Sequence, residues 1–323
     1  MGLILVTGSA GFIGAAVAHA LLARGDTVIG VDNLSNYYDV ALKQARLAQL
    51  TPQSNFHFHQ IDISNRNEML KLGSDVPGIN GIVHLAAQPG VRYSLENPYA
   101  YVTANVMGQV VMLELARTLS ALKHFVYASS SSVYGANTKT PFTVGDAVDQ
   151  PNSLYAATKR ADELFSHSYA HLYGVPATGL RFFTVYGPWG RPDMAPMLFA
   201  KAISAGKPIQ VFNHGEMWRD FTFIDDIVDG VLRALDRPAA GSPPHAIYNL
   251  GNHKSEKLTT FIAEIEKALN KKAVLEMAPM QPGDVPATFA DIAAATRDLG
   301  FEPTTPISVG IPKFVDWFRQ YYG

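Results

Sequence analysis

The 323-residue chain contains no cysteine. This absence excludes disulfide bonds, a thiol nucleophile and a metal site held by thiolates. An excess of charge of one sign is also missing, because 26 basic residues stand against 28 acidic residues and give a formal net charge of −2. The composition therefore favours neither nucleic acid nor an anionic membrane as the main partner.

Long apolar runs are absent from the beginning of the chain. The first residues, MGLILVTGSAGFIG, lead directly into a structured pattern without a charged leader segment. We therefore expect no signal peptide and no membrane span, and a cytoplasmic location. With 47% hydrophobic and 17% charged residues, the chain has the composition of a globular protein with one large domain or two modest ones.

Short apolar runs alternate with amphipathic segments through the first half of the chain. Strands are predicted at 3–8, 27–32, 56–63, 81–87, 124–130 and 177–187, and helices at 12–25, 99–119 and 155–173. This βαβα alternation predicts an α/β fold with a doubly wound parallel sheet of the Rossmann type and helices on both of its faces.

The pattern changes after Gly187. Residues 187–196 are rich in proline and glycine and predict a loop, and residues 208–224 predict a hairpin. Helices are predicted at 224–237, 261–269 and 308–322, and a short strand at 248–251. We expect Asp225 and Asp226 to cap the first of these helices, and the apolar side chains of the last one to join the core, namely Phe314, Trp317 and Phe318.

The segment GSAGFIG lies between the first strand and the first helix. It places Gly8, Gly11 and Gly14 in a GxxGxxG spacing. In such a turn, glycines allow the backbone to approach a pyrophosphate, and the helix N-terminus supplies N–H donors. A tight strand-to-helix turn without a ligand is the alternative interpretation.

Asp32 favours the nucleotide interpretation. It ends the second predicted strand, where a carboxylate can bind a ribose 2′-hydroxyl and repels a 2′-phosphate, so the sequence indicates NAD rather than NADP. Asn33 follows and is a candidate for the adenosine. Lys43 and Arg46 lie on the next predicted helix, where a solvated helix face is expected and a phosphate contact is the alternative.

Further candidates follow the next two strands. Asp62 and Ile63 end the predicted strand 56–63, where they can flank an adenine, and the segment HLAAQ ends the strand 81–87 with the small residues Ala86 and Ala87. Ligands of doubly wound sheets bind at the carboxyl ends of the strands. The sequence therefore predicts that these residues line one cofactor site.

Two segments carry candidate reactive groups. YASSSSVYG places four hydroxyls at the end of an apolar run, and LYAATKRADE places Tyr155 and Lys159 four residues apart, on one face of a helix. A tyrosine hydroxyl titrates near ~10, but a neighbouring ammonium and a cationic nicotinamide favour its phenolate, which can act as a base. One serine can then donate to the reacting oxygen while others hold a sugar.

Histidine pairs are the alternative site. His167 and His171 are four residues apart on a predicted helix, and His57 and His59 alternate on a strand. Neither pair has a third ligand at a useful spacing, and a catalytic metal needs at least three protein ligands. We expect no metal site.

Together these motifs resemble those of the extended short-chain dehydrogenase/reductases, the NAD-dependent epimerase/dehydratase family, over nearly the whole chain. The resemblance rests on the motifs GSAGFIG, VDN, HLAAQ, SSSSVYG, YAATK and RFFTVYGPWGRPDM. The longer strings QPGVRYSLENP and MQPGDVPATFAD are most similar to those of nucleotide-sugar epimerases that act on UDP-glucuronate. Pro89 departs from that pattern, because a small residue is expected there beside the substrate loop.

The resemblance implies an isomerase that converts UDP-glucuronate to UDP-galacturonate by epimerisation at C4, with NAD as cofactor and a transient 4-keto sugar. It implies a homodimer formed through the helices near 99–119 and 155–173. It also implies an NAD-binding Rossmann domain of residues 1–186 and about 220–250, and a smaller α/β domain for the nucleotide sugar of about 187–219 and 251–323.

The site residues that the resemblance implies fall into three groups. The catalytic residues are Ser130, Tyr155 and Lys159. The cofactor-binding residues are Gly8, Gly11, Phe12, Ile13, Gly14, Asp32, Asn33, Lys43, Asp62, Ile63, Leu85, Ala86, Ala87, Gln88, Asn105, Tyr155 and Lys159. The substrate-binding residues are Arg92, Ser130, Ser131, Ser132, Thr184, Arg191, Arg219, Gln281 and Asp284.

Three alternatives remain open. UDP-glucose 4-epimerase shares the chemistry, and UDP-glucuronate decarboxylase shares the substrate. The related decarboxylases typically carry an acidic side chain before VYG, where this chain has serines, so the sequence favours epimerisation. A nucleotide-binding protein without catalytic activity should have lost Tyr155 or Lys159, and both are present.

Overall fold

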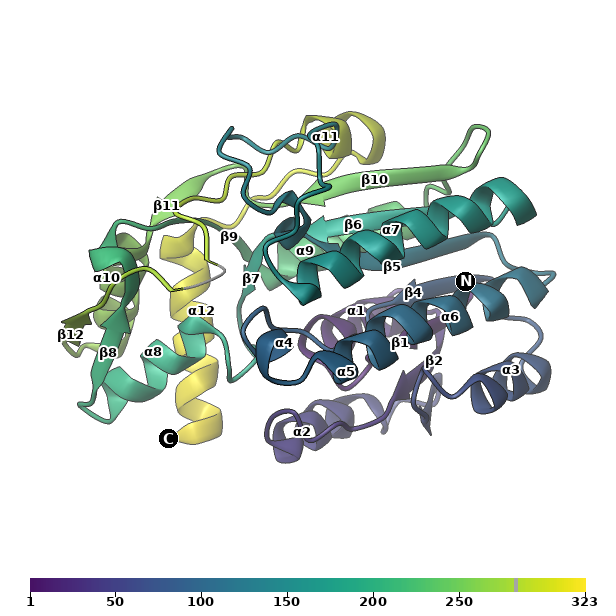
Figure 1. Cartoon of the computed structure of the whole chain (residues 1–323). Helices are drawn as coiled ribbons and strands as arrows, with labels where there is room; N and C mark the ends of the chain where they lie inside the picture. Colours follow the sequence, from purple (N-terminus) through teal and green to yellow (C-terminus); the bar gives the residue numbers. More distant parts are fainter. Residues whose placement is uncertain (282–283) are drawn as a thin grey trace.

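Seven parallel strands form the main sheet of the computed structural model, which describes residues 1–281 and 284–323 (Figure 1). Their order is β10-β6-β5-β4-β1-β2-β3, and neighbouring strands run parallel. The strands are β1 (Leu3–Thr7), β2 (Thr27–Asp32), β3 (Phe56–Gln60), β4 (Gly81–His84), β5 (His124–Ser130), β6 (Ala177–Phe182) and β10 (His245–Leu250). The chain builds outward from β1 in one direction and from β4 in the other, which confirms the predicted doubly wound sheet.

Helices cover both faces of the sheet (Figure 1). One face carries α1 (Phe12–Ala23), α2 (Val40–Leu50) and α9 (Ile224–Leu235), and the other carries α3 (Arg66–Asp75), α6 (Gly108–Thr118) and α7 (Leu154–Tyr173). Successive strand residues point to opposite faces, so Leu5 packs in one apolar cluster and Val6 in the other. Burial on both faces explains why the strands are nearly continuous apolar runs.

The helix predicted at 99–119 is interrupted. The chain forms α4 (Tyr93–Glu96), α5 (Pro98–Tyr101), a π-helical segment η1 (Val102–Met107) and then α6. In the π segment, the buried Asn105 side chain receives a hydrogen bond from the Gln88 backbone N–H and donates to the Gln88 carbonyl oxygen. Apolar periodicity does not reveal such an insertion, which is frequent at functional sites.

The hairpin predicted at 208–224 is wrong. The strand β8 (Pro208–Val211) pairs in parallel with β12 (Val274–Met277), and β9 (Trp218–Phe223) lies between β11 (Ser255–Lys257) and β7 (Thr184–Tyr186). Between β8 and β9, Asn213 and His214 adopt left-handed backbone conformations that turn the chain away. The predicted strand 177–187 likewise divides between two sheets, because β6 ends at Phe182 and β7 joins the three-stranded sheet.

The remaining helices pack around these small sheets. They are α8 (Ala195–Ser204), α10 (Leu258–Leu269), α11 (Ala293–Leu299) and α12 (Ile307–Tyr322). The predicted core side chains of α12, Phe314, Trp317 and Phe318, are buried. None of the helices in residues 1–281 and 284–323 combines the length and apolar character needed to cross a membrane. The predicted boundaries of the two domains stay a prediction.

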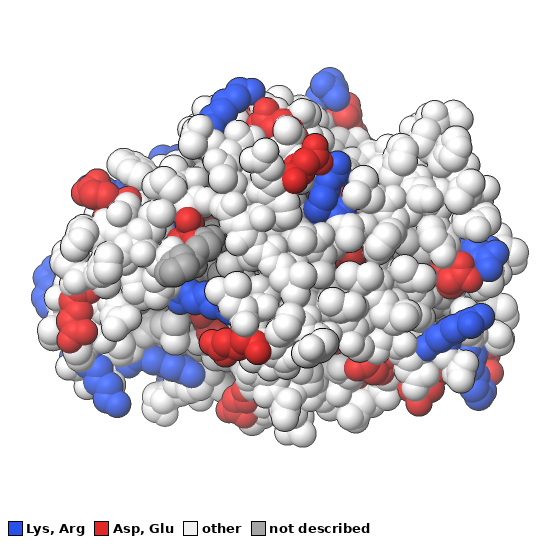
Figure 2. All heavy atoms as spheres, in the orientation of Figure 1, with Lys and Arg blue, Asp and Glu red and all other residues white. Residues whose placement is uncertain are grey.

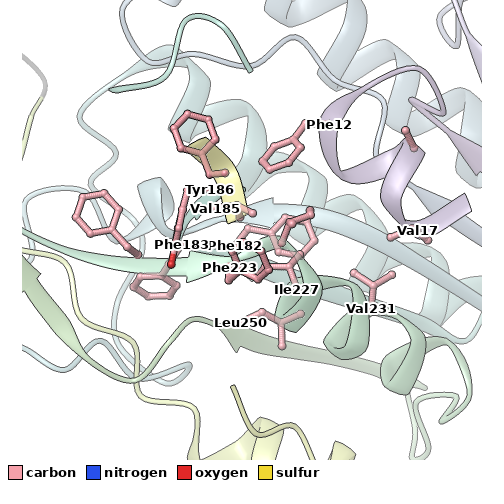
Figure 3. Packing of buried hydrophobic residues seen from close by; sticks show 14 of the residues in the cluster. Phe12, Val17, Phe182, Phe183, Val185, Tyr186, Phe223, Ile227, Val231 and Leu250 are labelled. Atoms are coloured by element: carbon pink, nitrogen blue, oxygen red, sulfur yellow. The ribbon is translucent and has the colours of Figure 1, made fainter. Parts of the chain in front are cut away.

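Aromatic side chains fill the junction between the main sheet and the small sheets (Figure 3). The chain leaves β6 through the buried residues Phe182 and Phe183 and continues into β7. There the Tyr186 ring lies 5.6 Å from the Phe223 ring, between their centroids. This packing fixes the segment that leads from the end of the main sheet to the loop at 187–194.

The expectation that Asp225 and Asp226 cap α9 is wrong. Asp225 and Asp226 lie in the first turn of α9, which begins after the cap residue Phe223. The Asp226 carboxylate instead accepts hydrogen bonds from the backbone N–H groups of Thr304 and Thr305. It therefore ties the C-terminal segment to the start of this helix.

Candidate active site

A cleft with a volume of about 390 Å³ opens at the carboxyl ends of β1, β2, β4 and β5. This is the position where doubly wound sheets bind ligands, beside the point where the strand order changes direction. Most of the predicted site residues line it, namely Gly8, Gly11, Phe12, Ile13, Gly14, Asp32, Asn33, Lys43, Asp62, Ile63, Leu85, Ala86, Ala87, Gln88, Ser130, Ser131, Ser132, Tyr155, Lys159, Thr184 and Arg191.

The glycine turn forms one end of the cleft. Gly8 has a φ of +72°, and a Cβ atom on Gly14 would lie 2.0 Å from the Gly8 carbonyl oxygen, so a side chain fits poorly at either position. Gly11 caps α1 and has no side chain that could accept from the first N–H groups of this helix. These N–H groups and the positive end of the helix dipole fit the pyrophosphate of a dinucleotide.

Asp32 lies beside this turn at the end of β2. Its carboxylate accepts hydrogen bonds from the backbone N–H groups of Ala10 and Leu34 and lies 3.8 Å from Lys43 Nζ. The solvated face predicted for Lys43 and Arg46 is wrong, because both side chains are buried. Burial lowers the pKa of Lys43, an effect that Asp32 opposes. Arg46 holds the loop after β7 by donating to the Trp189 carbonyl oxygen.

Loops form the part of the cleft beside Asn33 and Asp62. The strand predicted at 56–63 ends at Gln60, so Asp62 and Ile63 lie beyond it, and Asn33 Nδ2 donates to Asp62 Oδ2 at 2.8 Å. The strand predicted at 81–87 likewise ends at His84. Leu85, Ala86, Ala87 and Gln88 therefore follow as loop residues.

His84 lies under the cleft at the end of β4. Burial lowers the pKa of its imidazole to about 3, and the charge of Lys159 lowers it further. The neutral ring is hydrogen bonded to the Thr7 hydroxyl at 2.7 Å, and the same hydroxyl accepts from the Ala86 N–H. His84 therefore fixes the loop after β4 without adding a positive charge beside Lys159.

The serines divide between two environments. Ser129 donates to Glu163 Oε1 at 2.6 Å, and Glu163 is paired with the buried Arg181. Ser130 instead hydrogen bonds with Ser132 through its hydroxyl and accepts from the Ser132 N–H. The hydroxyls of Ser130 and Ser132 therefore bind each other and not a buried ion pair. Both residues line the cleft next to Ser131 and Thr184.

Tyr155 and Lys159 come from the first turns of α7. Ser153 caps this helix by accepting from the Ala156 N–H, which fixes the position of both residues. Lys159 Nζ donates to the Ala128 carbonyl oxygen and to Asp162 Oδ2, each at 3.1 Å. Tyr155 is half buried and its ring lies 6.1 Å from the Tyr101 ring. A phenol, an ammonium and the Ser130 hydroxyl therefore line one cleft, an arrangement suited to moving a proton.

Tyr37 and Asp193 were missed by the sequence reasoning. The Tyr37 side chain lines the cleft, and its hydroxyl donates to Asp193 Oδ2 at 3.1 Å. Burial and the Asp193 charge raise the pKa of Tyr37 to about 12, so its hydroxyl stays protonated. Asp193 also accepts from Nε and Nη2 of Arg191. The only available signal was the closeness of Tyr37 to Asp32 and of Asp193 to Arg191 in the sequence.

Five predicted residues do not line the cleft. Asn105 lies behind its wall and holds the Gln88 backbone. Arg92 stacks on the Phe212 ring and reaches Asp284 at 3.7 Å, and Arg219 donates to the Pro286 carbonyl oxygen. Gln281 stands before the undescribed residues 282–283. Arg92 and Asp284 are thus brought together, but outside the cleft proper.

No group of three or more histidine, aspartate or glutamate side chains suited to a metal ion occurs in the described parts of the chain. His167 instead packs edge to face on His245, with 5.4 Å between the ring centroids. His57 and His59 lie on β3, at the edge of the main sheet.

Comparison with known proteins agrees with this architecture. Residues 4–251 match the protein family described as NAD dependent epimerase/dehydratase. UDP-glucuronate 4-epimerase 4 of Arabidopsis thaliana is 48% identical over 332 residues, which cover 99% of this chain and 76% of that protein. The probable UDP-glucuronate 4-epimerase of Rhizobium meliloti is 45% identical over 333 residues, which cover 98% of this chain and 97% of that protein.

A solved structure extends the likeness to three dimensions. It is the crystal structure of UDP-glucuronic acid 4-epimerase from Bacillus cereus in complex with UDP-glucuronic acid and NAD. The two chains are 35% identical, and the match covers 99% of this chain and 100% of the other with a TM-score of 0.92. By sequence and by fold, the chain belongs to the NAD-dependent epimerase/dehydratase family.

Proposed function

We propose that this protein is an NAD-dependent UDP-glucuronate 4-epimerase, an isomerase that interconverts UDP-glucuronate and UDP-galacturonate through a transient 4-keto sugar. The observation that carries the proposal is one shared cleft: Tyr155, Lys159 and Ser130 line the same cavity as the glycine turn and Asp32. The family membership and the activity named for the relatives support it.

The cofactor end of the cleft fits NAD. The uncapped N-terminus of α1 can receive the pyrophosphate, and Asp32 can accept from a ribose 2′-hydroxyl. When bound, NAD would supply a hydride acceptor and donor for C4 of the sugar. Because it is regenerated in each turnover, we expect it to remain tightly bound.

The protein's own groups move and hold protons. We assign Tyr155 as the base that takes the proton from the sugar 4-hydroxyl and later returns it, with the Lys159 ammonium favouring the phenolate. Ser130 donates a hydrogen bond to the reacting oxygen. Lys159 has three donors, of which two bind Ala128 and Asp162, so one remains for the cleft.

The substrate carboxylate creates a hazard that the site must control. A 4-ketone with a carboxylate on C5 is a β-keto acid, and it loses CO2 readily when the C5–C6 bond stands perpendicular to the carbonyl plane. We assign Ser131, Ser132 and Thr184 as the hydroxyl donors that hold the carboxylate away from this geometry, with the Arg191 guanidinium as an additional cationic donor. We assign Arg92, Arg219, Gln281 and Asp284 to the uridine diphosphate.

A homodimer is part of the proposal. The segment from α4 to η1 and the helix α7 expose large apolar side chains, namely Leu95, Tyr99, Val102, Met107, Leu164, Leu172 and Tyr173. Figure 2 shows few charged side chains over the centre of this face. Such a face is typical of a protein interface. Light scattering of the purified protein should give twice the 35.1 kDa mass of one chain.

The proposed function is tested by NMR analysis of products from UDP-glucuronate, without added NAD. We expect UDP-galacturonate to form, because bound NAD is retained during purification. UDP-xylose as the main product would instead indicate a decarboxylase. Turnover of UDP-glucose with no turnover of UDP-glucuronate would indicate an epimerase of neutral sugars.

A further inference from the structure

We propose that Asp162 is a positioning residue whose carboxylate keeps the Lys159 ammonium protonated and directed into the cleft. The inference concerns the lysine to which the proposed function assigns the activation of Tyr155, and it rests on that proposal for its catalytic consequence. The pairing of the two side chains is a property of the fold alone.

The ion pair is enclosed by the protein. Asp162 is 1% exposed and Lys159 is 4% exposed, and Asp162 Oδ2 lies 3.1 Å from Lys159 Nζ, one helical turn further along α7. A buried ammonium loses its proton easily unless an opposite charge compensates the loss of hydration. Asp162 supplies that charge at hydrogen-bonding distance.

Geometry also restricts where the ammonium can point. Nζ is held from two sides, by the Ala128 carbonyl oxygen at the end of β5 and by Asp162 on α7. An ammonium has three N–H donors, so these two acceptors leave one donor for the cleft that Lys159 lines. Removing one acceptor frees the ammonium to rotate.

The other charged groups around the pair do not replace Asp162. Glu163, the next residue on α7, forms an ion pair with Arg181 of β6 and also lies 3.1 Å from Arg160. His84 of β4 is neutral, because burial and Lys159 lower its pKa to about 3. Tyr127 of β5 is buried, and its pKa is raised well above the ordinary value, so it too is neutral.

The second carboxylate oxygen, Asp162 Oδ1, is buried and has no hydrogen-bond partner. An unpaired acceptor of this kind destabilises a fold. Burial raises the pKa of Asp162 to about 6, and Lys159 acts in the opposite direction, so the carboxylate is ionised at neutral pH and above. The site therefore contains a costly anion that is in contact with Lys159.

Removing this anion should make neighbouring groups lose their protons at lower pH. An opposite charge at this distance typically shifts titration by about one pH unit or more. In Asp162→Asn, Lys159 should therefore titrate at lower pH, and both limbs of the kcat profile for UDP-glucuronate should move in the same direction. A side chain needed only for packing would change stability or rate without moving the profile.

The experiment compares Asp162→Asn with Asp226→Asn, which neutralises another buried carboxylate that is bonded to Thr304 and Thr305 instead of a lysine. The ¹³Cε NMR signal of Lys159 is followed from pH 5 to 11 in ligand-free protein labelled with ¹³C-lysine. The signal is assigned by its absence from the spectrum of Lys159→Met. We expect the pH at the midpoint of this titration to fall by at least about half a unit in Asp162→Asn and to stay unchanged in Asp226→Asn. A smaller shift, or an equal shift in Asp226→Asn, overturns the proposal.

A second measurement serves if Asp162→Asn does not fold. The Lys159 Cε signal of the parent protein should then show a step near pH 6, where Asp162 takes up its proton. A signal without that step overturns the proposal. These NMR measurements need no turnover, so they test the role of Asp162 even if UDP-glucuronate is not the substrate. Failure of the proposed function would be seen separately, as a parent protein that does not convert UDP-glucuronate.

Discussion

The Tyr37 hydroxyl donates to Asp193 Oδ2 at 3.1 Å and joins the loop after β2 to the loop after β7 across the cleft. The same carboxylate accepts from the Arg191 guanidinium, so the tyrosine helps to fix an arginine that lines the cavity. This link connects the side of the cleft assigned to the cofactor with the side assigned to the sugar.

Tyr37→Phe should therefore weaken substrate binding more than catalysis. Loss of one hydrogen bond to a charged group costs about 1.5–3 kcal/mol, so we expect KM for UDP-glucuronate to rise roughly 10- to 150-fold with a smaller change in kcat. Steady-state kinetics measures both constants. Tyr322→Phe, at the exposed end of α12, is the control. An unchanged KM in Tyr37→Phe would show that Asp193 and Arg191 need no support.

The hydroxyls around the proposed carboxylate position should control product identity. In Ser132→Ala and Thr184→Val, the carboxylate of the 4-keto sugar is held less firmly and reaches the geometry for loss of CO2 more often. We expect a decarboxylated UDP-pentose to increase by about tenfold relative to the epimer, the effect of losing about one hydrogen bond. NMR of the product mixture measures the ratio. A ratio equal to that of the parent enzyme would show that these hydroxyls do not control which product forms.

The glycine turn gives a matched test of stability. A Cβ on Gly14 would lie 2.0 Å from the Gly8 carbonyl oxygen, whereas a Cβ on Gly145 meets nothing within 4 Å. Gly14→Ala should lower the free energy of unfolding by about 2 kcal/mol or more and reduce the NAD content of the purified protein. Gly145→Ala should change stability by less than about 1 kcal/mol. Equal urea midpoints for the two variants would contradict the close approach.

Buried histidines should make the fold sensitive to acid. Burial lowers the pKa of His124 from its ordinary 6.5 to about 4, while its ring bonds the Leu235 carbonyl oxygen and the Thr178 hydroxyl. Because the unfolded chain binds this proton first as the pH falls, stability declines from about pH 6.5 down to pH 4. For His124 alone the decline is at most about 3 kcal/mol.

His124→Gln should reduce this dependence on pH. The variant is expected to be less stable at pH 7, since it loses packing, but to lose less of its stability between pH 7 and pH 5 than the parent protein does. Urea unfolding at the two pH values gives the comparison. An identical loss in both proteins would mean that His124 is not held neutral in the folded state.

The sequence was informative where local chemistry decides the structure. Gly8, Gly11, Gly14 and Asp32 could be assigned to one end of a doubly wound sheet because strand ends meet at the same edge. The Tyr155 and Lys159 pair followed from helix periodicity alone. These residues depend on neighbours in the chain or on the general geometry of the fold.

Contacts between distant segments could not be predicted in this way. The partner of β8 is β12, far along the chain, and periodicity gives no information on pairing. Lys43 and Arg46 were expected on a solvated face because long cationic side chains are usually exposed. Their burial depends on Asp32 and on the Trp189 backbone, which come from other elements.

The account depends most on Tyr155 acting as the base, and Tyr155→Phe tests this most directly. The variant should fold, keep its NAD and bind UDP-glucuronate, while NMR shows the interconversion with UDP-galacturonate slowed at least about 100-fold. Tyr322→Phe, at the exposed end of α12, should retain the parent rate. Interconversion by a folded, NAD-containing Tyr155→Phe protein at the rate of the parent would contradict the account.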